Sequence, residues 1–306
     1  MHNNLTLRQL SVFVAVAQTG STTGAAQYLA MSQSAVSSAL AELEHALSEK
    51  LFDRRGRKLF LNDFGRVLLP RVRALFDHVD SIVNAGRNST ALLRVGASMT
   101  ISNYLLPPFL AQYHKKQAVT GVGSTVTLMV GNTQEVLSAV HNFDVDVGLI
   151  EGSCSVDEFV VEHWMDDTLF IVASPDHPLA RPGAATRQAL RLADWLVREH
   201  DSGTREVLDM QVAPILGPLH IALELAAPEV IRRTVIAGYG ISCLSSLVVG
   251  PDLANGTLVD IGRELPSLLR PFSIVLHKDK LPTHGLEAFL AHLRAVPAPE
   301  TKYDRT

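Results

Sequence analysis

Cysteine, charge and long apolar runs are all scarce in this sequence. Cys154 and Cys243 are the only cysteines among 306 residues, and their spacing is not that of a metal site. We therefore expect two small buried side chains in a reducing compartment. No run of about 18 apolar residues occurs, so no membrane span is predicted. Met1 to Asn4 lack the basic start of a cleavable signal, so we expect a cytoplasmic protein.

The motifs of common active sites are missing as well. The twelve histidines are scattered, and there is no H-E-x-x-H, Cys/His cluster or G-x-S-x-G. Asp144 and Asp146 are interpreted as solvated or helix-capping groups. Gly238-Tyr239-Gly240 is interpreted as a helix C-cap rather than a phosphate loop. We therefore expect no enzyme activity, no metal and no cofactor.

The charge that is present is unevenly distributed. Residues 1–90 hold ten Lys and Arg against seven Asp and Glu, whereas the remainder holds seventeen against twenty-four. The basic excess is sharpest within 50–73. A basic segment on an acidic body is typical of a chain that contacts phosphate at one end only. A solvated charged loop is the alternative.

Three helices are predicted in the first fifty residues. Apolar residues recur every three or four positions from Leu7 to Ala17, as on one face of a helix. A shorter helix follows over about 22–29, then a tight turn at 30–32. The third helix, of about sixteen residues, has Ser32 as its N-cap.

The third helix has a face suited to base recognition. Val36, Leu40 and Leu43 belong to its buried stripe, so the outward face of its first turns is polar and uncharged. Such a face can enter the major groove, where hydroxyl and amide groups read base edges. Serines on a helix are usually solvated surface, but these follow a helix and turn and precede a basic segment. The predicted base-contacting residues are Ser32, Gln33, Ser34, Ser37 and Ser38.

A basic β-hairpin is predicted directly after that helix. Apolar residues of 51–61 flank a glycine-centred basic tip, which is typical of a wing. Its cations suit phosphate and minor-groove contacts. The predicted wing contacts are Arg54, Arg55, Arg57 and Lys58.

A long helix is predicted from its cap at Asn62 to about Gly86. Five apolar residues in it are spaced as a heptad seam, and such a seam more often pairs with another helix than lies on a globular surface. We therefore predict a dimerisation linker that places two heads on a pseudo-palindromic site. The seam residues are Leu68, Val72, Leu75, Val79 and Ile82.

The first sixty-five residues resemble the N-terminal signature of LysR-type transcriptional regulators. A weaker resemblance extends to about residue 295. The positions that carry the signature are Gly20, Ser21, Ala25, Ala26, Leu29, Ser32, Gln33, Ser34, Ala35, Val36, Ser37, Leu43, Glu44, Leu51, Phe52, Arg54, Leu61 and Gly65.

Three positions depart from the family's pattern. Thr22 stands where the family usually has an aromatic residue, and Ser48 where it usually has the glycine that closes the recognition helix. Asn62 replaces the usual threonine cap. Serine tolerates a positive φ less well than glycine, whereas asparagine caps a helix as well as threonine. None of the three removes a predicted DNA contact.

From Leu92 onward strands and helices alternate. The order is βαβαβ, which predicts a parallel sheet with helices on its faces. The predicted strands are 92–96, 125–130, 145–150, 169–173, 195–198, 220–225, 241–244 and 272–276, with a last helix at 286–293. Two lobes joined near 163–168 and 267–271 resemble the periplasmic-binding-protein-like effector domain of the family. That fold closes on a ligand by hinge motion.

The predicted effector site lies at the carboxyl ends of these strands, where such sheets bind ligands. At 202–205 hydroxyls, a glycine and an arginine meet a predicted helix N-terminus, which favours a small carboxylate or inorganic oxyanion. Ordinary helix caps are the alternative there and at 98–100 and 132–133. Glu151 would repel an anion unless it is paired or turned away. The predicted effector-binding residues are Ser98, Thr100, Asn132, Thr133, Glu151, Ser202, Gly203 and Thr204.

The expected fold is an all-α winged helix-turn-helix head, a long linker helix and a two-lobed α/β effector domain. Their expected ranges are 1–62, 63–90 and 91–306, with one lobe over about 91–165 and 268–297 and the other over about 166–267. The resemblance implies a transcriptional regulator whose DNA affinity or DNA bending is controlled by the effector. The expected partners are promoter DNA, the effector, further copies of the chain in a dimer and homotetramer, and RNA polymerase, but no membrane. The alternatives are a small-molecule binding protein, which would be expected to carry an export signal, and an enzyme with an appended head.

Overall fold

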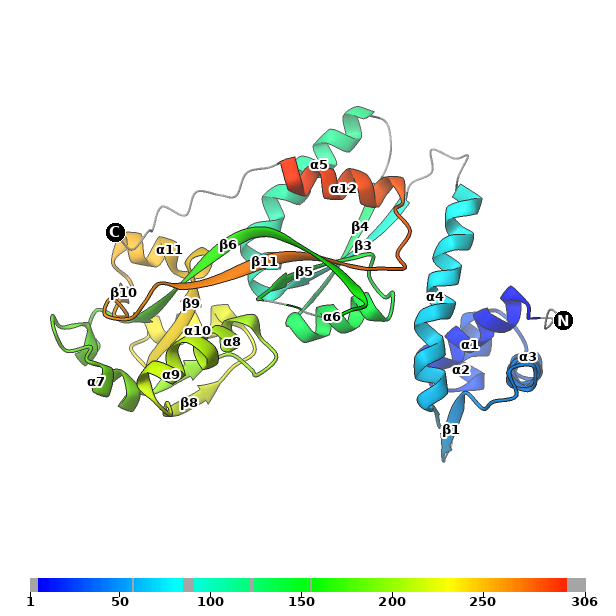
Figure 1. Cartoon of the computed structure of the whole chain (residues 1–306), viewed down its shortest axis with the longest axis horizontal. Coiled ribbons are helices and arrows are strands. Elements are labelled where there is room, and N and C mark those ends of the chain that lie inside the picture. The colour runs from blue at the N-terminus through cyan, green and yellow to red at the C-terminus, as the bar shows by residue number, and fades with distance from the viewer. Residues whose placement is uncertain are drawn as a thin grey trace. The chain divides into compact units, whose positions relative to one another are not determined.

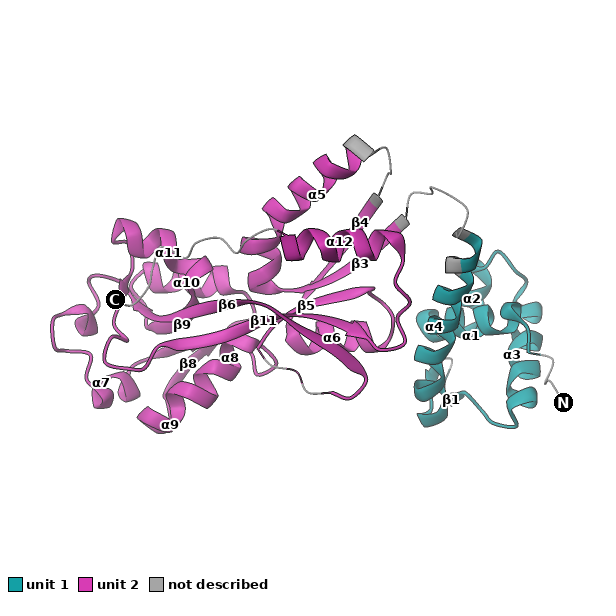
Figure 2. Cartoon of the chain, turned by 45° about the horizontal axis from the view of Figure 1, so that its top comes forward, with its two compact units in different colours: residues 1–86 teal, residues 87–306 magenta. Residues whose placement is uncertain are grey.

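The computed structural model describes residues 5–56, 58–84, 91–120, 124–152, 154 and 156–295. The chain divides into two units, Met1–Gly86 and Arg87–Thr306 (Figure 2). Each unit buries its own hydrophobic clusters. No helix of the described residues is long and apolar enough to cross a membrane.

The first unit is a three-helix head with a hairpin and a long helix (Figure 1). Its hydrophobic core contains Phe13 of the first helix, Ala25 of the second and Val36 of the third, and all three are fully buried. Ala30, with a φ of 51°, makes the tight turn between the second and third helices. The elements are α1 (Leu7–Thr19), α2 (Thr22–Tyr28), α3 (Gln33–Leu47), β1 (Phe52–Arg55), β2 (Lys58–Leu61) and α4 (Asp63–Asn84).

Two of the positions that depart from the family pattern, Ser48 and Asn62, lie at the end of α3 and at the start of α4. Ser48 ends α3 with a φ of 56°, so a serine holds the left-handed conformation that glycine usually adopts. Asn62 caps α4 as predicted, because its Oδ1 accepts from the Gly65 backbone nitrogen at 2.8 Å. A Cβ at Gly65 would overlap the carbonyl oxygen of Leu51. Glycine is therefore required where α4 begins.

The second unit is built on one nine-stranded mixed sheet in the order β4-β3-β5-β11-β6-β9-β7-β8, with β10 paired to β6. The strands are β3 (Ala91–Ser98), β4 (Ser124–Gly131), β5 (Val147–Glu151), β6 (Phe159–Ala173), β7 (Trp195–Val197), β8 (Ile221–Glu224), β9 (Ile241–Ser245), β10 (Val259–Asp260) and β11 (Leu268–His277). β3 runs parallel to β4 and β5, and β7 runs parallel to β8 and β9, as the alternating pattern predicts.

Helices cover this sheet in two groups. The helices are α5 (Leu106–Thr120), α6 (Thr133–His141), α7 (Arg187–Leu192), α8 (Gly203–Val207), α9 (Ala213–Leu216), α10 (Pro228–Ile236), α11 (Ser246–Asn255) and α12 (His284–Ala295). Shorter turns are a π-helix at Ile101–Leu105, a 3-10 turn at Pro178–Ala180 and a π-helix at Leu208–Val212. One group of buried clusters centres on β3 and β5, and the other on β7 and β9, so the unit has two lobes.

The two lobes are joined by β6 and β11, which pair antiparallel along most of their length (Figure 1). The sequence analysis placed the crossovers near 163–168 and 267–271, and these segments lie in β6 and β11. It placed the strand itself only at 169–173, and that bound was wrong, because β6 is one continuous strand of 15 residues. Its first half is mostly exposed or half-buried, with only Phe159, Met165 and Asp167 buried, and β11 supplies the pairing that holds it extended. The same strand pair thus both connects the lobes and aligns residues of one with the other.

Candidate functional site

The polar face of α3 is exposed, as the sequence predicts. Ser32 caps the helix by accepting from the Ala35 backbone nitrogen at 3.1 Å. Ser32, Gln33, Ser34 and Ser38 are exposed and Ser37 is half-buried. The opposite stripe of α3 is buried in the head core. The face is therefore short, polar and open, which is what insertion into a major groove requires.

The side chain of Gln33 is held in place by two hydroxyls. Its Nε2 donates to Thr22 Oγ1 at 3.2 Å and to Ser37 Oγ at 3.3 Å. Thr22, which departs from the family's aromatic residue, thus contacts the recognition helix from the start of α2. A fixed side-chain amide reads a base edge with less loss of conformational freedom than a free one.

The wing is a hairpin that presents cations. β1 pairs with β2 so that Arg55 lies opposite Lys58, and Arg54, Arg55 and Lys58 are all exposed. The Arg55 guanidinium lies 5.6 Å from the centre of the Phe60 ring, which orients it. The Leu59 backbone nitrogen donates to the Gly20 carbonyl at 2.8 Å and ties the hairpin to the head. Arg57 lies outside the described residues.

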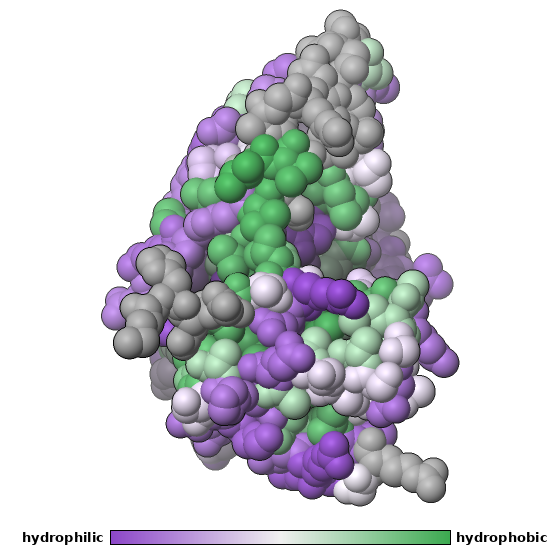
Figure 3. Space-filling model, turned by 90° about the vertical axis from the view of Figure 1, so that its right-hand side faces the viewer, coloured by the Kyte–Doolittle hydropathy of each residue, from purple (hydrophilic) through white to green (hydrophobic). Residues whose placement is uncertain are grey.

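The predicted seam on α4 is divided between two environments. Val72 is 4% exposed and belongs to the core of the head, and Leu68 packs against that core. Val79 is half-buried, while Leu75 and Ile82 are exposed. The face viewed in Figure 3 carries a band of apolar surface, and the exposed apolar side chains of α4 include Leu75, Ile82 and Val83. Within the described residues Leu75 is 40% exposed and Ile82 75% exposed.

In the second unit, the predicted effector-binding residues gather around a buried arginine that the sequence analysis missed. Arg270 of β11 is 1% exposed and forms ion pairs with Glu151 and, at 2.7 Å, with Asp167. Its Nη1 donates to Thr204 Oγ1 at 2.8 Å, and its Nη2 to Thr100 Oγ1 at 3.4 Å. Glu151 is thus paired, so it does not stand as an unpaired negative charge against an anion.

Each partner of Arg270 comes from a different part of the fold. Glu151 ends β5 in the first lobe, and Thr204 lies in the first turn of α8 in the second lobe. Asp167 lies opposite Arg270 in the pairing of β6 with β11. The network therefore links both lobes to both connecting strands. We call it the Arg270 network, with members Thr100, Glu151, Asp167, Thr204 and Arg270.

The two carboxylates of the network differ in acidity. Burial by itself raises the pKa of Glu151, but Arg270, the Ser98 hydroxyl and Arg198 hold that pKa below its ordinary value. Burial raises the pKa of Asp167 more than Arg270 lowers it, and the nearby charge of Glu151 adds to the rise. Ser245 and Ser246 donate to Asp167 Oδ1 at 2.8 and 3.2 Å. Glu151 is therefore the more acidic of the two counter-charges, while Asp167 contacts two nitrogens of Arg270, Nε at 2.8 Å and Nη2 at 2.7 Å.

The remaining predicted effector residues support the backbone around this network. Asn132 caps α6 by accepting from the Glu135 backbone nitrogen at 2.9 Å, and Ser202 caps α8 by accepting from that of Thr204 at 3.2 Å. Both fit the helix-cap alternative. Thr133 Oγ1 donates to the Glu151 carbonyl at 3.0 Å. A Cβ at Gly203 would lie 2.5 Å from that same carbonyl oxygen, so glycine lets the lobes approach.

Among the described residues, two buried polar atoms beside the network, Ser98 Oγ and Arg198 Nη1, have no partner in full hydrogen-bond geometry. The Ser98 hydroxyl still interacts with the Glu151 carboxylate closely enough to lower its pKa. Both groups act on Glu151, since each lowers its pKa. Arg198 directly follows β7 and pairs through Nε with Glu199 at 2.8 Å. A buried guanidinium nitrogen left without a partner is costly, and an anion would satisfy it.

A second contact between the lobes is a hydrogen bond of Tyr104. Tyr104, in the π-helix after β3, donates to Glu229 Oε2 of α10 at 2.9 Å. Burial and this hydrogen bond raise the pKa of Tyr104 to about 12, so the phenol stays protonated at neutral pH. Arg232 of α10 pairs in turn with Asp252 at 3.0 Å.

The sequence matches two family models that together span most of the chain. Residues 7–66 match the bacterial regulatory helix-turn-helix protein of the lysR family, and residues 86–298 match the LysR substrate binding domain. The chain belongs to the LysR family of transcriptional regulators. Its exposed α3 face and basic hairpin lie within the helix-turn-helix match, and the Arg270 network lies within the substrate-binding match.

Individual relatives agree along the whole length. The chain is 42% identical over 287 residues to the HTH-type transcriptional regulator YeiE of Escherichia coli K12, covering 94% of this chain and 96% of the relative. It is 30% identical over 291 residues to the regulator CysL of Bacillus subtilis, covering 94% and 96%. A full-length OxyR variant of Pseudomonas aeruginosa shares the fold, with a TM-score of 0.75 at 21% identity over 96% of each chain. ArgP of Mycobacterium tuberculosis superposes with a TM-score of 0.72 at 18% identity, covering 94% and 95%.

Proposed function

We propose that this regulator binds a small anion, a carboxylate or an inorganic oxyanion, at the junction of its two lobes. The observation that carries the proposal is a pair of enclosed atoms beside the Arg270 network, Ser98 Oγ and Arg198 Nη1, for which the described part of the chain offers no partner in full hydrogen-bond geometry. Glu151 is neutralised by Arg270, which removes the main electrostatic objection to an anion. Solved structures with this fold contain small ligands: the regulatory domain of Synechocystis CcmR is in complex with 2-PG, and LysG of Corynebacterium glutamicum has the effector Arg bound.

The effector acts by changing the balance between arrangements of the lobes. Because the Arg270 network reaches both lobes and both connecting strands, a ligand that satisfies Ser98 and Arg198 favours the arrangement that holds them together. A ligand shifts such an equilibrium only by its differential affinity for the two states. The change is passed to the head as altered DNA affinity or DNA bending.

The anion site is tested by thermal shift of the full-length protein in formate, acetate, oxalate, phosphate and sulfate at fixed ionic strength. Binding at about 100 times Kd stabilises the protein by about 2.7 kcal/mol. Ser98→Ala should weaken the effective anion about tenfold. Ser246→Ala removes a buried hydroxyl that already has a partner and should leave anion affinity unchanged. Equal affinity in wild type and Ser98→Ala would refute the assignment.

We also propose that the head binds promoter DNA as a dimer through α3 and the wing, with Ser32, Gln33, Ser34, Ser37 and Ser38 at base edges. Arg54, Arg55, Arg57 and Lys58 are assigned to phosphate and the minor groove. The proposed ranges are 1–62 for the head, 63–90 for the linker and 91–306 for the effector domain. We place the regulator in the cytoplasm and assign it no catalytic activity. RNA polymerase is proposed as a further partner.

Dimerisation is assigned to the exposed part of the α4 seam. Leu75 and Ile82 lie one heptad apart and both are exposed, whereas Val72 is already used in the head core. Leu75→Asn with Ile82→Asn should shift sedimentation toward the monomer. Val67→Asn changes an exposed apolar residue of the same helix off that line and should leave the assembly intact. A dimer or tetramer unchanged by the double substitution would remove the seam from the interface.

A further inference from the structure

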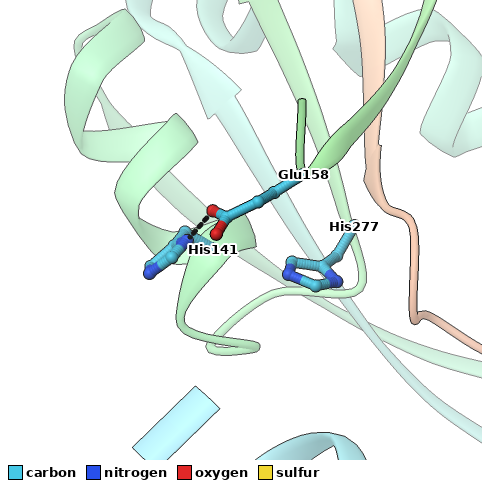
Figure 4. Close-up of side chains that lie close together, drawn as sticks. All are labelled: His141, Glu158 and His277. Atoms are coloured by element: carbon cyan, nitrogen blue, oxygen red, sulfur yellow. Dashed lines mark ion pairs between the residues drawn. The ribbon is translucent and has the colours of Figure 1, made fainter. Parts of the chain in front are cut away.

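Two histidines and a glutamate converge in the first lobe of the second unit. His141 is the last residue of α6, Glu158 directly precedes β6, and His277 ends β11. One donor atom from each lies within 4.8 Å of those of the other two (Figure 4). Imidazole nitrogens with a carboxylate oxygen are the ligand set of zinc and similar first-row divalent cations. The sequence analysis found no metal motif, because these residues come from three separate segments.

The sheet fixes two of the three positions. Phe159 lies opposite His277 in the pairing of β6 with β11, and the Lys278 backbone nitrogen donates to the Glu158 carbonyl at 2.9 Å. Glu158 and His277 are therefore neighbours across a hydrogen-bonded strand end. His141 reaches them from α6, and its Nδ1 lies 2.8 Å from Glu158 Oε2.

The ring of His277 is held with one nitrogen toward the cluster. Its side chain is only 11% exposed, and its ring centre lies 4.4 Å from that of Phe143. Its Nδ1 accepts from the Asp279 backbone nitrogen at 3.1 Å. This leaves Nε2 as the nitrogen toward Glu158 and His141 (Figure 4). With Nδ1 accepting, the ring proton lies on Nε2, so metal binding at Nε2 requires that proton to leave and Nδ1 to become the protonated nitrogen. The Asp279 carboxylate, whose Oδ2 lies 3.9 Å from Nδ1, then offers the second-shell acceptor that metal-bound histidines commonly have.

An ion can reach this cluster from solvent. The side chains of His141 and Glu158 are 42% and 54% exposed, and with Cys154 they line a cavity of about 370 Å³. His277 is not among the residues that line this cavity, so the cavity opens onto the His141 and Glu158 side of the cluster. Burial raises the pKa of the Cys154 thiol, so we do not count it among the ligands.

We propose that His141, Glu158 and His277 form a binding site for one Zn²⁺ or similar first-row divalent cation. Ligand atoms around tetrahedral zinc lie about 3.3 Å apart, so rotation of the two exposed side chains is enough to close the site. Calcium and magnesium are disfavoured because they prefer oxygen ligands. His277 lies seven residues beyond Arg270 on β11, or about 23 Å along the strand, so the metal and the proposed anion occupy different sites.

The test uses the untagged full-length protein and competition for Zn²⁺ with a chromophoric chelator. We expect one Zn²⁺ per chain, no comparable affinity for Mg²⁺, and visible absorption of bound Co²⁺ typical of four-coordination. His141→Ala, Glu158→Gln and His277→Gln should each weaken Zn²⁺ at least tenfold, because even second-shell changes cost about 10- to 100-fold.

The matched control is His220→Ala, which removes another exposed histidine paired with a carboxylate, Asp194, at 3.0 Å. It should leave Zn²⁺ affinity unchanged. His141→Ala and Glu158→Gln alter exposed side chains and should fold, so they test the zinc site even if His277→Gln fails to fold. Wild-type affinity in both of these variants, or an equal loss in His220→Ala, would overturn the proposal.

Discussion

The two units of this regulator hold their functional polar groups in opposite ways. In the head, Gln33, Ser34 and Ser38 are exposed and lie within one short stretch of α3. In the second unit, the members of the Arg270 network are almost completely buried, and Thr100 and Arg270 are 170 residues apart in sequence. An exposed, local surface suits a large rigid partner such as DNA. A buried, non-local network suits a small molecule whose binding is coupled to lobe movement.

The largest expected effect is the loss of folding stability of the second unit on Arg270→Met. The change leaves Glu151 and Asp167 buried without their counter-charge, and breaking a buried pair costs about 3–5 kcal/mol. Both tryptophans, Trp164 and Trp195, lie in the second unit, so tryptophan fluorescence during urea unfolding reports on that unit alone.

The control for this change is Arg294→Met. It removes a partly exposed pair with Glu162 at 2.5 Å, and exposed pairs contribute about 0–1 kcal/mol. Equal urea midpoints for the two variants would show that the Arg270 network does not hold the second unit together.

A smaller effect on stability is expected when the two carboxylates of the network, Glu151 and Asp167, are substituted one at a time. The pKa of Glu151 is lowered in the folded protein, so its stabilisation is present above its ordinary pKa and is lost as pH falls through the folded value. The pKa of Asp167 is raised, so its contribution is instead lost as pH rises from its ordinary value toward the folded one. At pH 7, Glu151→Gln should therefore cost about 3 kcal/mol and Asp167→Asn less.

Urea unfolding at pH 7 and at pH 4, again by tryptophan fluorescence, checks this order. The cost of Glu151→Gln should shrink at the lower pH, because the unfolded chain takes up a proton at Glu151 below its ordinary pKa while the folded protein, with its lowered pKa, does so only at lower pH. If Asp167→Asn proved the more costly change at neutral pH, the assignment of Glu151 as the more acidic counter-charge of Arg270 would be wrong.

In the head, Gln33→Ala should relax recognition at one base pair by about 1–3 kcal/mol. Thr22→Ala removes one of the two hydroxyls that hold the Gln33 amide and should cause a smaller loss at the same position. Binding selections on randomised operator sequences measure both. A sequence preference that survived Gln33→Ala unchanged would take this residue out of the base-contacting set.

The smallest free-energy effect per residue is expected at the wing. Arg54→Ala and Arg55→Ala should weaken binding to all sequences, because each removes a cation that neutralises a phosphate. The slope of log affinity against log salt should fall by about 1 for each phosphate that is no longer neutralised. Fluorescence anisotropy over a salt series measures that slope. An unchanged slope in the double variant would mean that these exposed arginines do not bind phosphate.

The same contrast explains what could be predicted from sequence. The helices of the head, the Ser32 and Asn62 caps and the hairpin depend on neighbouring residues, and the structure confirms them. Arg270 and Arg198 looked like ordinary charged residues, because their burial depends on strands paired far along the chain. Asp146 was likewise interpreted as a solvated or capping group, but it is buried and paired with Arg94 and Lys280. Local sequence patterns therefore predict helices, caps and hairpins, but not which charged residues become buried and paired across distant strands.

The most direct test of the account measures promoter affinity of the full-length protein with and without the anion that stabilises it most, at constant ionic strength. The account predicts a shift in DNA affinity or in DNA bending for the wild type, and no shift for Ser98→Ala at the same anion concentration. An anion that stabilised the second unit yet left both DNA affinity and bending unchanged would contradict the link between the lobes and the head.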